Sequence, residues 1–397
     1  MNILRDFYQE NTVAGSKICS EAEMHFLSIA PRGSLALCIV DGEGKNYETA
    51  RGVISRFYKA EPINAVSFSA EKAEKLKIKS EIGLIISIGG ERAVALGKFL
   101  SYKYGLKHIF FALNPCSVEY LIEFVSLPCR DGYNEIYPGK VPSLIFCDDD
   151  LLLDGDDTAN GYGRICSRLV GLFDADVRRV VYGECNESAY CKCLRTICDT
   201  IKEREITAQK IFRYGIILSE GLKELGWSAD ACISLVRALK LKKKAEKSEV
   251  VDDGKVEGEV AKIIASIYLS ALSRPLVSGV FAPNNNRSMG ALSQVLGIHP
   301  FRARRVVSRL QSNLALEEHL YCLSLYRDEL KQRASLYRKT LIFTAQKQKR
   351  LYKDKGFSYN GYADENSVRV ALPFVAEMRG KFTLFSLLKQ TGYISTK

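Results

Sequence analysis

The sequence predicts an α/β domain followed by an all-helical domain. Short apolar runs alternate with amphipathic segments of about 10–15 residues through the N-terminal part, which is typical of βαβ units and a largely parallel, Rossmann-like sheet. Beyond residue 150 nearly every segment has the periodicity of a helix. The chain of 397 residues is long enough for two cores. We therefore predict an N-terminal domain at 1–150 and a helical C-terminal domain at 151–397.

The apolar runs locate the elements of the first domain in order. We expect buried strands at 34–41, 65–69, 84–88, 108–112 and 144–147, with a helix at about 46–59 after the first strand. In the second domain, residues 242–259 are charged and contain glycine, so we expect a mobile loop between helices there. Residues 283–287 form a turn cluster. Because parallel sheets bind ligands outside the carboxyl ends of their strands, we look for the site at that edge.

Composition restricts the class of protein. An apolar content of 47% and a charged content of 26% are ordinary for a soluble globular protein. No run of about 18 apolar residues indicates a transmembrane helix, and residues 1–10 lack the core of a signal peptide. We expect a cytoplasmic protein with no membrane partner. The net charge of +11 comes largely from 240–244, 302–309 and 347–355, which we interpret as solvated helix faces and loops.

Residues 289–310 offer a competing interpretation of the basic charge. They read as a helix, a glycine turn and a basic second helix, the order of a helix-turn-helix motif for DNA. The same apolar spacing suits two amphipathic helices packed in a bundle. Since no separate domain surrounds this segment, we favour the bundle and expect no nucleic-acid partner.

The twelve cysteines do not indicate a disulfide framework, because they are spread along a chain without a secretion signal. Cysteines in apolar contexts are interpreted as small core residues: Cys19, Cys38, Cys147, Cys166 and Cys232. The one cluster comprises Cys185, Cys191, Cys193 and Cys198. Cys191 and Cys193 lie in a segment that looks helical, where side chains two residues apart do not share a face. The cluster is therefore a poor candidate for zinc.

Four stretches carry motif information. Residues 82–98 read as an apolar strand, a Gly89-Gly90 turn and an amphipathic helix, and 108–117 as a strand with a loop containing Pro115. Residues 159–164 read Ala-Asn-Gly-Tyr-Gly-Arg, and 378–392 contain Arg-Gly-Lys-Phe-Thr-Leu-Phe. Their order and spacing resemble the superfamily of iron-containing alcohol dehydrogenases, glycerol-1-phosphate dehydrogenases and 3-dehydroquinate synthases. The last stretch is most similar to the glycerol-1-phosphate dehydrogenase branch. The resemblance implies a dehydroquinate synthase-like fold.

The resemblance also implies a nicotinamide cofactor, NAD(P), at the glycine turn. A tight turn before a helix lets the backbone approach a pyrophosphate, whose charge the helix N-terminus favours. In the family this stretch runs Gly-Gly-Gly-Ser, two residues, Asp, two residues, Lys. Here Glu91 stands for the third glycine, Arg92 for the serine and Ala95 for the aspartate. The candidate cofactor-binding residues are Asp41, Gly89, Gly90, Arg92, Lys98 and Asn114. Tight strand–helix turns use glycine in any case, so a purely structural role stays open.

The family's metal site is where this chain departs most. The resemblance implies zinc or iron held by one carboxylate and two histidines, with the metal polarising the substrate oxygen. Arg164 replaces the carboxylate, and a guanidinium cannot coordinate a divalent metal. Phe281 and Ala282 stand where the first histidine motif ends, which leaves His299 as the one candidate ligand. We therefore expect no metal. A buried Arg164 needs a counter-charge, for which we expect Asp157 or Glu184.

Two functions remain open. In the first, the chain is a divergent relative of the glycerol-1-phosphate dehydrogenases that lacks a working metal site and is retained as a nucleotide- or phosphate-binding protein or as a partner of an enzyme. In the second, it is an active NAD(P)-dependent oxidoreductase that reduces a phosphorylated ketone such as dihydroxyacetone phosphate, with Arg164 and His299 as the candidate catalytic residues. The expected ligand is a phosphorylated small molecule or a nucleotide, and a homo-oligomer is compatible with both functions.

Overall fold

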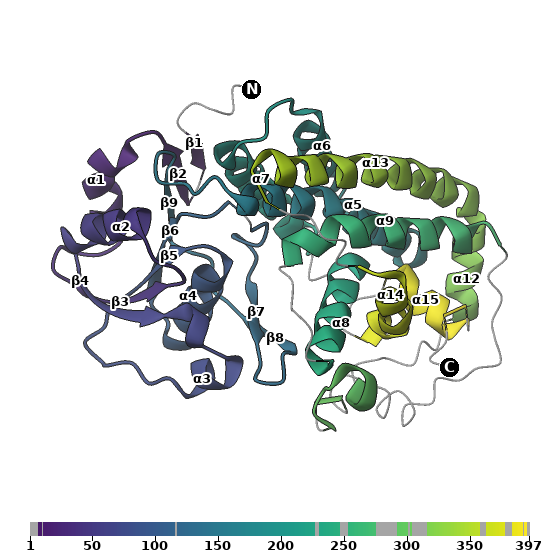
Figure 1. Ribbon diagram of the computed structural model, residues 1–397, viewed down its shortest axis with the longest axis horizontal. Coiled ribbons are helices and arrows are strands. Elements are labelled where there is room, and N and C mark those ends of the chain that lie inside the picture. Colours follow the sequence, from purple (N-terminus) through teal and green to yellow (C-terminus); the bar gives the residue numbers. More distant parts are fainter. Residues whose placement is uncertain are drawn as a thin grey trace. The chain divides into compact units, whose positions relative to one another are not determined.

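A computed structural model describes residues 7–9, 11–115, 117–226, 230–246, 253–274, 292–300, 302–303, 316–357, 363–377, 383–391 and 393–394. The chain forms two compact units (Figure 1). Unit 1 comprises residues 1–130, 134–162 and 203–223, and unit 2 comprises residues 131–133, 163–202 and 224–397. Unit 1 thus takes in residues 151–162 and 203–223 besides most of the first 150 residues.

A seven-stranded sheet forms the centre of unit 1, with the strand order β1-β2-β9-β6-β5-β3-β4. Apart from the antiparallel pair β1–β2, all neighbours are parallel, which confirms the predicted sheet type. The strands are β1 (Phe7–Gln9), β2 (Thr12–Gly15), β3 (Leu35–Val40), β4 (Lys59–Asn64), β5 (Leu84–Gly89), β6 (Lys107–Ala112) and β9 (Leu144–Asp148).

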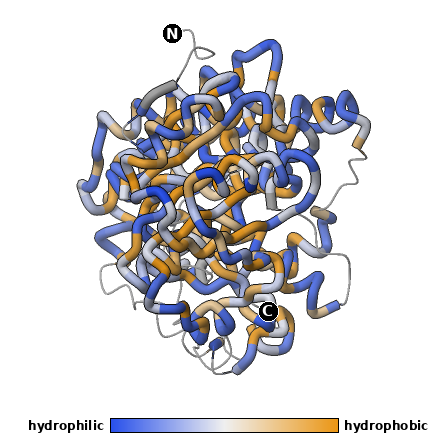
Figure 2. The backbone as a smooth tube through the Cα atoms, turned by 90° about the vertical axis from the view of Figure 1, so that its left-hand side faces the viewer, coloured by the Kyte–Doolittle hydropathy of each residue, from blue (hydrophilic) through white to orange (hydrophobic). Residues whose placement is uncertain are grey.

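Both faces of this sheet are covered, which is why β5 is buried at every position. Alternate residues of β5 enter different cores: Ile86 packs in one cluster and Ile85 in another. The helices of unit 1 are α1 (Ala22–Leu27), α2 (Lys45–Ser55), α3 (Ala70–Lys75), α4 (Glu91–Tyr104) and α7 (Ala208–Glu224), with 3-10 turns η1 (Ile18–Ser20) and η2 (Ala65–Ser67). Figure 2, which views unit 1 from the left of Figure 1, shows hydrophobic residues along its inner segments.

Helix α7 comes late in the chain but belongs to unit 1 through buried polar contacts. The fully buried Arg213 donates from Nη2 to Oδ2 of Asp149 at 2.7 Å, just after β9. Ser219 accepts the amide of Leu121 at 2.8 Å. Phe212 packs with Phe110 and Ile145 of the sheet. These contacts position the carboxyl end of β9.

One predicted strand was wrong, and five strands of unit 1 were not predicted. Residues 65–69 are not a strand, because Asn64 accepts the amide of Val66 and starts the η2 turn. The strand precedes them as β4, an exposed edge strand that tolerates Pro62. The pair β1–β2 at the other edge and a separate antiparallel hairpin of β7 (Phe124–Pro128) and β8 (Asn134–Pro138) had no clear apolar signal.

The described residues of unit 2 form helices and no strand, as predicted for the second domain. The helices are α5 (Asp156–Tyr182), α6 (Glu187–Lys202), α8 (Ala231–Ala245), α9 (Asp253–Leu272), α12 (Leu316–Leu325), α13 (Arg327–Asp354), α14 (Glu365–Ala371), η3 (Leu372–Glu377) and α15 (Leu384–Gln390). Helix α5 begins in unit 1 and continues into unit 2. The most extensive packing in unit 2 joins α9 to α13, which lie side by side in Figure 1.

The loop predicted at 242–259 was wrong over most of its length. Helix α8 continues to Ala245 and α9 begins at Asp253. The glycines that suggested a loop serve packing instead: a Cβ at Gly258 would lie 2.1 Å from Oε1 of Gln348 on α13. Within the described residues, no helix is long and apolar enough to cross a membrane.

Candidate functional site

The candidate site of unit 1 lies where three adjacent parallel strands end. Strands β3, β5 and β6 are neighbours in the sheet, and their carboxyl ends lead into Asp41, Gly89-Gly90 and Asn114. The structure therefore brings together four of the residues that the sequence singled out. Helix α4 starts at Glu91, directly after the glycine turn, so its N-terminal amides face this edge.

The carboxylate of Asp41 is bound to the backbone at the start of α4. The amide of Gly90 donates to Oδ1 at 3.1 Å and to Oδ2 at 3.0 Å, and the amide of Ala93 donates to Oδ2 at 3.0 Å. Gly89 makes this approach feasible, because a Cβ there would lie 1.8 Å from Oδ1 of Asp41 and its φ is +130°. Tyr47, which sequence reasoning missed, donates its hydroxyl to Oδ1 at 3.1 Å.

Two opposing effects act on Asp41. Burial raises the pKa of its carboxyl group, while the hydrogen bonds from Ala93, Gly90 and Tyr47 and the charge of Arg92 favour the ionised form. Three charge-assisted hydrogen bonds and a helix N-terminus are a suitable environment for an anion. In this chain the anion is one of its own side chains.

Asn114 and the first residues of α4 complete this edge. A Cβ at Gly90 would lie 3.0 Å from Cβ and Nδ2 of Asn114, so the amide side chain lies against the turn. Its Oδ1 atom is buried and, within the described residues, has no hydrogen-bond partner. Glu91 is half-buried on the first turn of the helix, and Arg92 is exposed. This edge therefore contains two carboxylates, those of Asp41 and Glu91, and one cation, Arg92.

Lys98, predicted to frame a cofactor, is buried beneath the following loop. Its Nζ donates to the carbonyl oxygens of Glu119 at 2.9 Å and Phe124 at 3.3 Å. Burial lowers the pKa of Lys98 to about 8. Burial, and to a lesser extent the charge of Lys98, lowers the pKa of His108 to about 3. The ring of His108 forms a hydrogen bond with the hydroxyl of Ser87 at 2.6 Å. The geometry gives Lys98 a structural function, and a role toward a cofactor stays a prediction.

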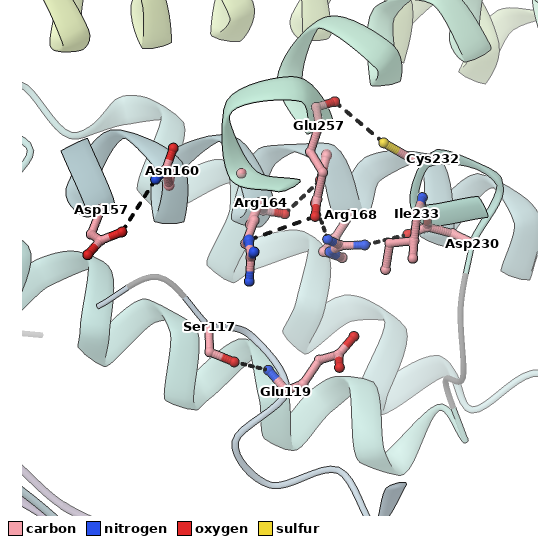
Figure 3. A network of polar contacts seen from close by, with 12 residues as sticks. Ser117, Glu119, Asp157, Asn160, Arg164, Arg168, Asp230, Cys232, Ile233 and Glu257 are labelled. Atoms are coloured by element: carbon pink, nitrogen blue, oxygen red, sulfur yellow. Dashed lines mark hydrogen bonds and ion pairs between the residues drawn. The ribbon is translucent and has the colours of Figure 1, made fainter. Parts of the chain in front are cut away.

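In unit 2 the motif residue Arg164 belongs to a buried ionic cluster on α5, α8 and α9 (Figure 3). Its Nε lies 3.8 Å from Oε1 of Glu257. Arg168, one turn further along α5, pairs with Glu257 and, at 2.9 Å, with Asp230. All four side chains are at most 6% exposed. We call Arg164, Arg168, Asp230 and Glu257 the ion cluster.

The ion cluster is balanced and well supplied with hydrogen bonds. Two guanidinium groups face two carboxylates, so their formal charges sum to zero. Ser167 donates to Oε2 of Glu257 at 2.9 Å, and Asp230 caps α8 by accepting the amide of Ile233 at 2.9 Å. Both carboxylates of the cluster therefore accept hydrogen bonds beyond their ion pairs.

The structure pairs Arg164 with a carboxylate that was not among the predicted counter-charges. Asp157 accepts a hydrogen bond from Asn160, and Glu184 is exposed. The partner is Glu257, which lies in the stretch that the sequence suggested was a loop. Asp230 and Arg168 were missed as well. The one available signal was the capping pattern of an aspartate directly before the apolar helix α8.

Among the described residues of unit 2, the position of Arg164 does not offer the metal-binding carboxylate that the resemblance implies. A guanidinium paired with a carboxylate stands at the motif position that the resemblance assigns to a metal-binding carboxylate. His299 is exposed, and its carbonyl oxygen accepts the amides of Arg302 and Ala303. Phe281 and Ala282 lie outside the described residues. Among described residues, no group of three or more His, Cys, Asp or Glu side chains could hold a metal ion.

The fold accounts for the positions of the cysteines that the structure describes. Cys191 and Cys193 both lie on α6, the first exposed and the second buried, so they occupy different faces as predicted. Cys38, Cys147, Cys166 and Cys232 are buried, as expected of core residues, and Cys19 packs against a core cluster. Of the proposed helix-turn-helix, only residues 292–300 and 302–303 are described.

Comparison with solved structures shows the fold. An alcohol dehydrogenase from Oenococcus oeni is 11% identical with a TM-score of 0.53, and the match covers 98% of this chain and 100% of that one. A probable glycerol dehydrogenase from Sinorhizobium meliloti 1021 is 11% identical with a TM-score of 0.52, covering 87% and 99%. An archaeal halo-thermophilic alcohol dehydrogenase from a Red Sea brine pool is 10% identical with a TM-score of 0.52, covering 99% and 95%.

The chain therefore has the fold of the alcohol and glycerol dehydrogenases in the superfamily that its motifs resemble. No protein-family model matches the sequence, and no curated protein sequence matches it. Identity of 10–11% shows the architecture alone. The glycerol-1-phosphate dehydrogenase branch stays a prediction.

Proposed function

We propose that this protein binds a nucleotide, such as NAD(P), or another phosphorylated small molecule, and that it does not carry out metal-dependent dehydrogenation. The observation that carries this proposal is the ion cluster. Arg164 takes the motif position of a metal-binding carboxylate, and its charge is paired with Glu257 inside the helical unit. A guanidinium in that position has no lone pair to offer a divalent ion.

The ligand-binding half of the proposal is supported by the sheet edge of unit 1. The glycine turn, the start of α4 and Asn114 lie at the carboxyl ends of adjacent parallel strands. Ligands of open α/β sheets bind in this place. The fold is that of dehydrogenases, which is compatible with a nicotinamide nucleotide as the ligand.

The first test combines metal analysis with a thermal-shift screen against NAD(H), NADP(H) and sugar phosphates, including dihydroxyacetone phosphate. We expect at least one of these compounds to raise the melting temperature equally with and without a chelator. Assays of NAD(P)H oxidation with ketose phosphates, with and without added zinc, address the alternative oxidoreductase. Turnover that a chelator abolishes contradicts the proposal.

A second test concerns Arg164 itself. Arg164→Asp should not create a tight zinc site, because the new carboxylate faces Glu257, which remains paired with Arg168. Calorimetric titration with zinc measures this directly, with Arg164→Met as the uncharged control. Stoichiometric, tight zinc binding by Arg164→Asp contradicts our assignment of the donor set.

A further inference from the structure

Two amide groups at the start of α4 already bind an anion, and this limits what else can bind there. In proteins that accept a diphosphate at a strand–turn–helix junction, free backbone amides and the positive end of the helix supply the attraction. Here the amides of Gly90 and Ala93 are both used by the carboxylate of Asp41. A diphosphate that approached this turn would meet the Asp41 carboxylate at two of the amides it would otherwise use.

Two further observations at the same edge agree with this description. Glu91, the first residue of α4, adds a second carboxylate within the first turn. Asn114, against Gly90, presents a buried Oδ1 acceptor that has no hydrogen-bond partner within the described residues. Such an acceptor is satisfied by a ligand hydroxyl or amine and not by a phosphate oxygen. The edge is therefore rich in acceptors.

We propose that Asp41 is a specificity-determining residue that competes with diphosphate at the glycine turn, so that a ligand can place a diphosphate there only by displacing its carboxylate. The inference rests on the proposed function for the location of the ligand. It adds the ligand class: the unaltered turn favours hydroxyl- or amine-bearing groups, such as those of a nucleoside, over a diphosphate.

The Asp41 carboxylate is held firmly enough to compete. It accepts three backbone hydrogen bonds between 3.0 and 3.1 Å and a fourth from the hydroxyl of Tyr47. Gly89 removes the side chain that would otherwise block it. A diphosphate has to replace all of these charge-assisted contacts before it gains its own, which lowers its apparent affinity.

The test uses Asp41→Asn and Asp41→Ser in the full chain, since both remove the charge and serine also shortens the side chain. The probes are inorganic pyrophosphate, NADH and adenosine, titrated by calorimetry. For pyrophosphate and NADH we expect affinity to rise by roughly tenfold or more in both variants, the scale of charge-assisted hydrogen bonds. For adenosine we expect no gain.

Asp148→Asn is the matched control, because Asp148 ends the parallel strand β9 and accepts the backbone amides of Lys17, Cys19 and Asp150. It removes a carboxylate that binds amides in the same unit, but not at α4. An equal gain in pyrophosphate affinity for Asp148→Asn, or no gain for either Asp41 variant, overturns the inference. The Asp41 variants could gain affinity for pyrophosphate while the unaltered protein binds neither nucleotides nor sugar phosphates. That result supports the inference and contradicts the proposed function.

Discussion

At the scale of single residues, Arg168 contributes more to unit 2 than the motif residue Arg164. Arg168 bridges Asp230 on one side and Glu257 on the other, whereas Arg164 approaches Glu257 at 3.8 Å. Removing Arg168 leaves two buried carboxylates without their main cation, and an uncompensated buried charge is strongly disfavoured.

We therefore predict that Arg168→Met lowers the free energy of unfolding by about 3–5 kcal/mol, the range for breaking a buried pair. Arg164→Met should cost clearly less, because Arg168 still neutralises Glu257. Urea denaturation followed by circular dichroism measures both. The exposed pair Arg32–Glu23 supplies a control, since Arg32→Met should cost no more than about 1 kcal/mol. Equal losses for Arg168→Met and Arg164→Met contradict this description of the ion cluster.

Asp174 gives unit 2 a dependence on pH. Its carboxylate accepts the hydroxyl of Tyr268 at 2.7 Å and the amides of Ala231 at 3.1 Å and Leu384 at 3.2 Å, so it joins α5 to α8, α9 and α15. Burial raises the pKa of Asp174 to about 7 from 3.8. A carboxyl group with a raised pKa in the folded state binds its proton more tightly there than in the unfolded chain.

The contribution of Asp174 to stability is thus fully present below pH 3.8 and is lost as the pH rises through about 7. We predict that Asp174→Asn removes this decline, so that the difference in unfolding free energy between variant and wild type changes in favour of the variant between pH 4 and pH 7. Denaturation at several pH values tests it. A difference that is constant with pH, or that changes in the opposite direction, refutes the prediction.

At the scale of elements, a motif glycine and a glycine that looked like a loop signal lie where the helices of unit 2 pack closely. Gln348 on α13 lies between Gly163 on α5 and Gly258 on α9, and a Cβ at either glycine would lie 2.1 Å from its amide group. Its Nε2 donates to the carbonyl oxygen of Gly254 at 2.9 Å. Sequence periodicity could not detect this, because a glycine in a polar stretch reads as a loop until the facing helix is known.

We predict that Gly258→Ala destabilises the protein by about 1–3 kcal/mol, the cost of overpacking, although alanine is the better helix former. The matched control is Gly52→Ala on α2, where a Cβ would meet nothing within 4 Å. That substitution should stabilise by about 0.4–1 kcal/mol. Thermal denaturation of the two variants side by side is sufficient. Stabilisation by Gly258→Ala shows that α13 is not held as closely as we describe.

The same scale shows what sequence can predict. The strands near 84, 108 and 144 and the turn at Gly89 followed from apolar runs, because a parallel strand covered on both faces is hydrophobic throughout. Edge strand β4 and the hairpin β7–β8 are short and half exposed, so they carry no such signal. The position of Arg164 was readable from its motif, but its partner Glu257 is 93 residues away and depends on how α9 packs on α5.

At the scale of the whole molecule, the fold is similar to that of dehydrogenases, whereas the residues of the two candidate sites differ from those that the resemblance implies. The architecture is similar to that of two solved alcohol dehydrogenases over nearly the entire chain. The ion cluster, however, places a balanced set of side-chain charges at the motif position of a metal ligand, and Asp41 places a carboxylate on the amides of the glycine turn.

The most direct test of the central claim is the metal content of the purified full-length protein, produced without a metal-binding tag in cells supplied with zinc and iron and measured by mass spectrometry. The account predicts substoichiometric zinc and iron, and a melting temperature that a chelator does not change. One tightly held zinc or iron per chain, whose removal lowers the melting temperature or abolishes ligand binding, would contradict it.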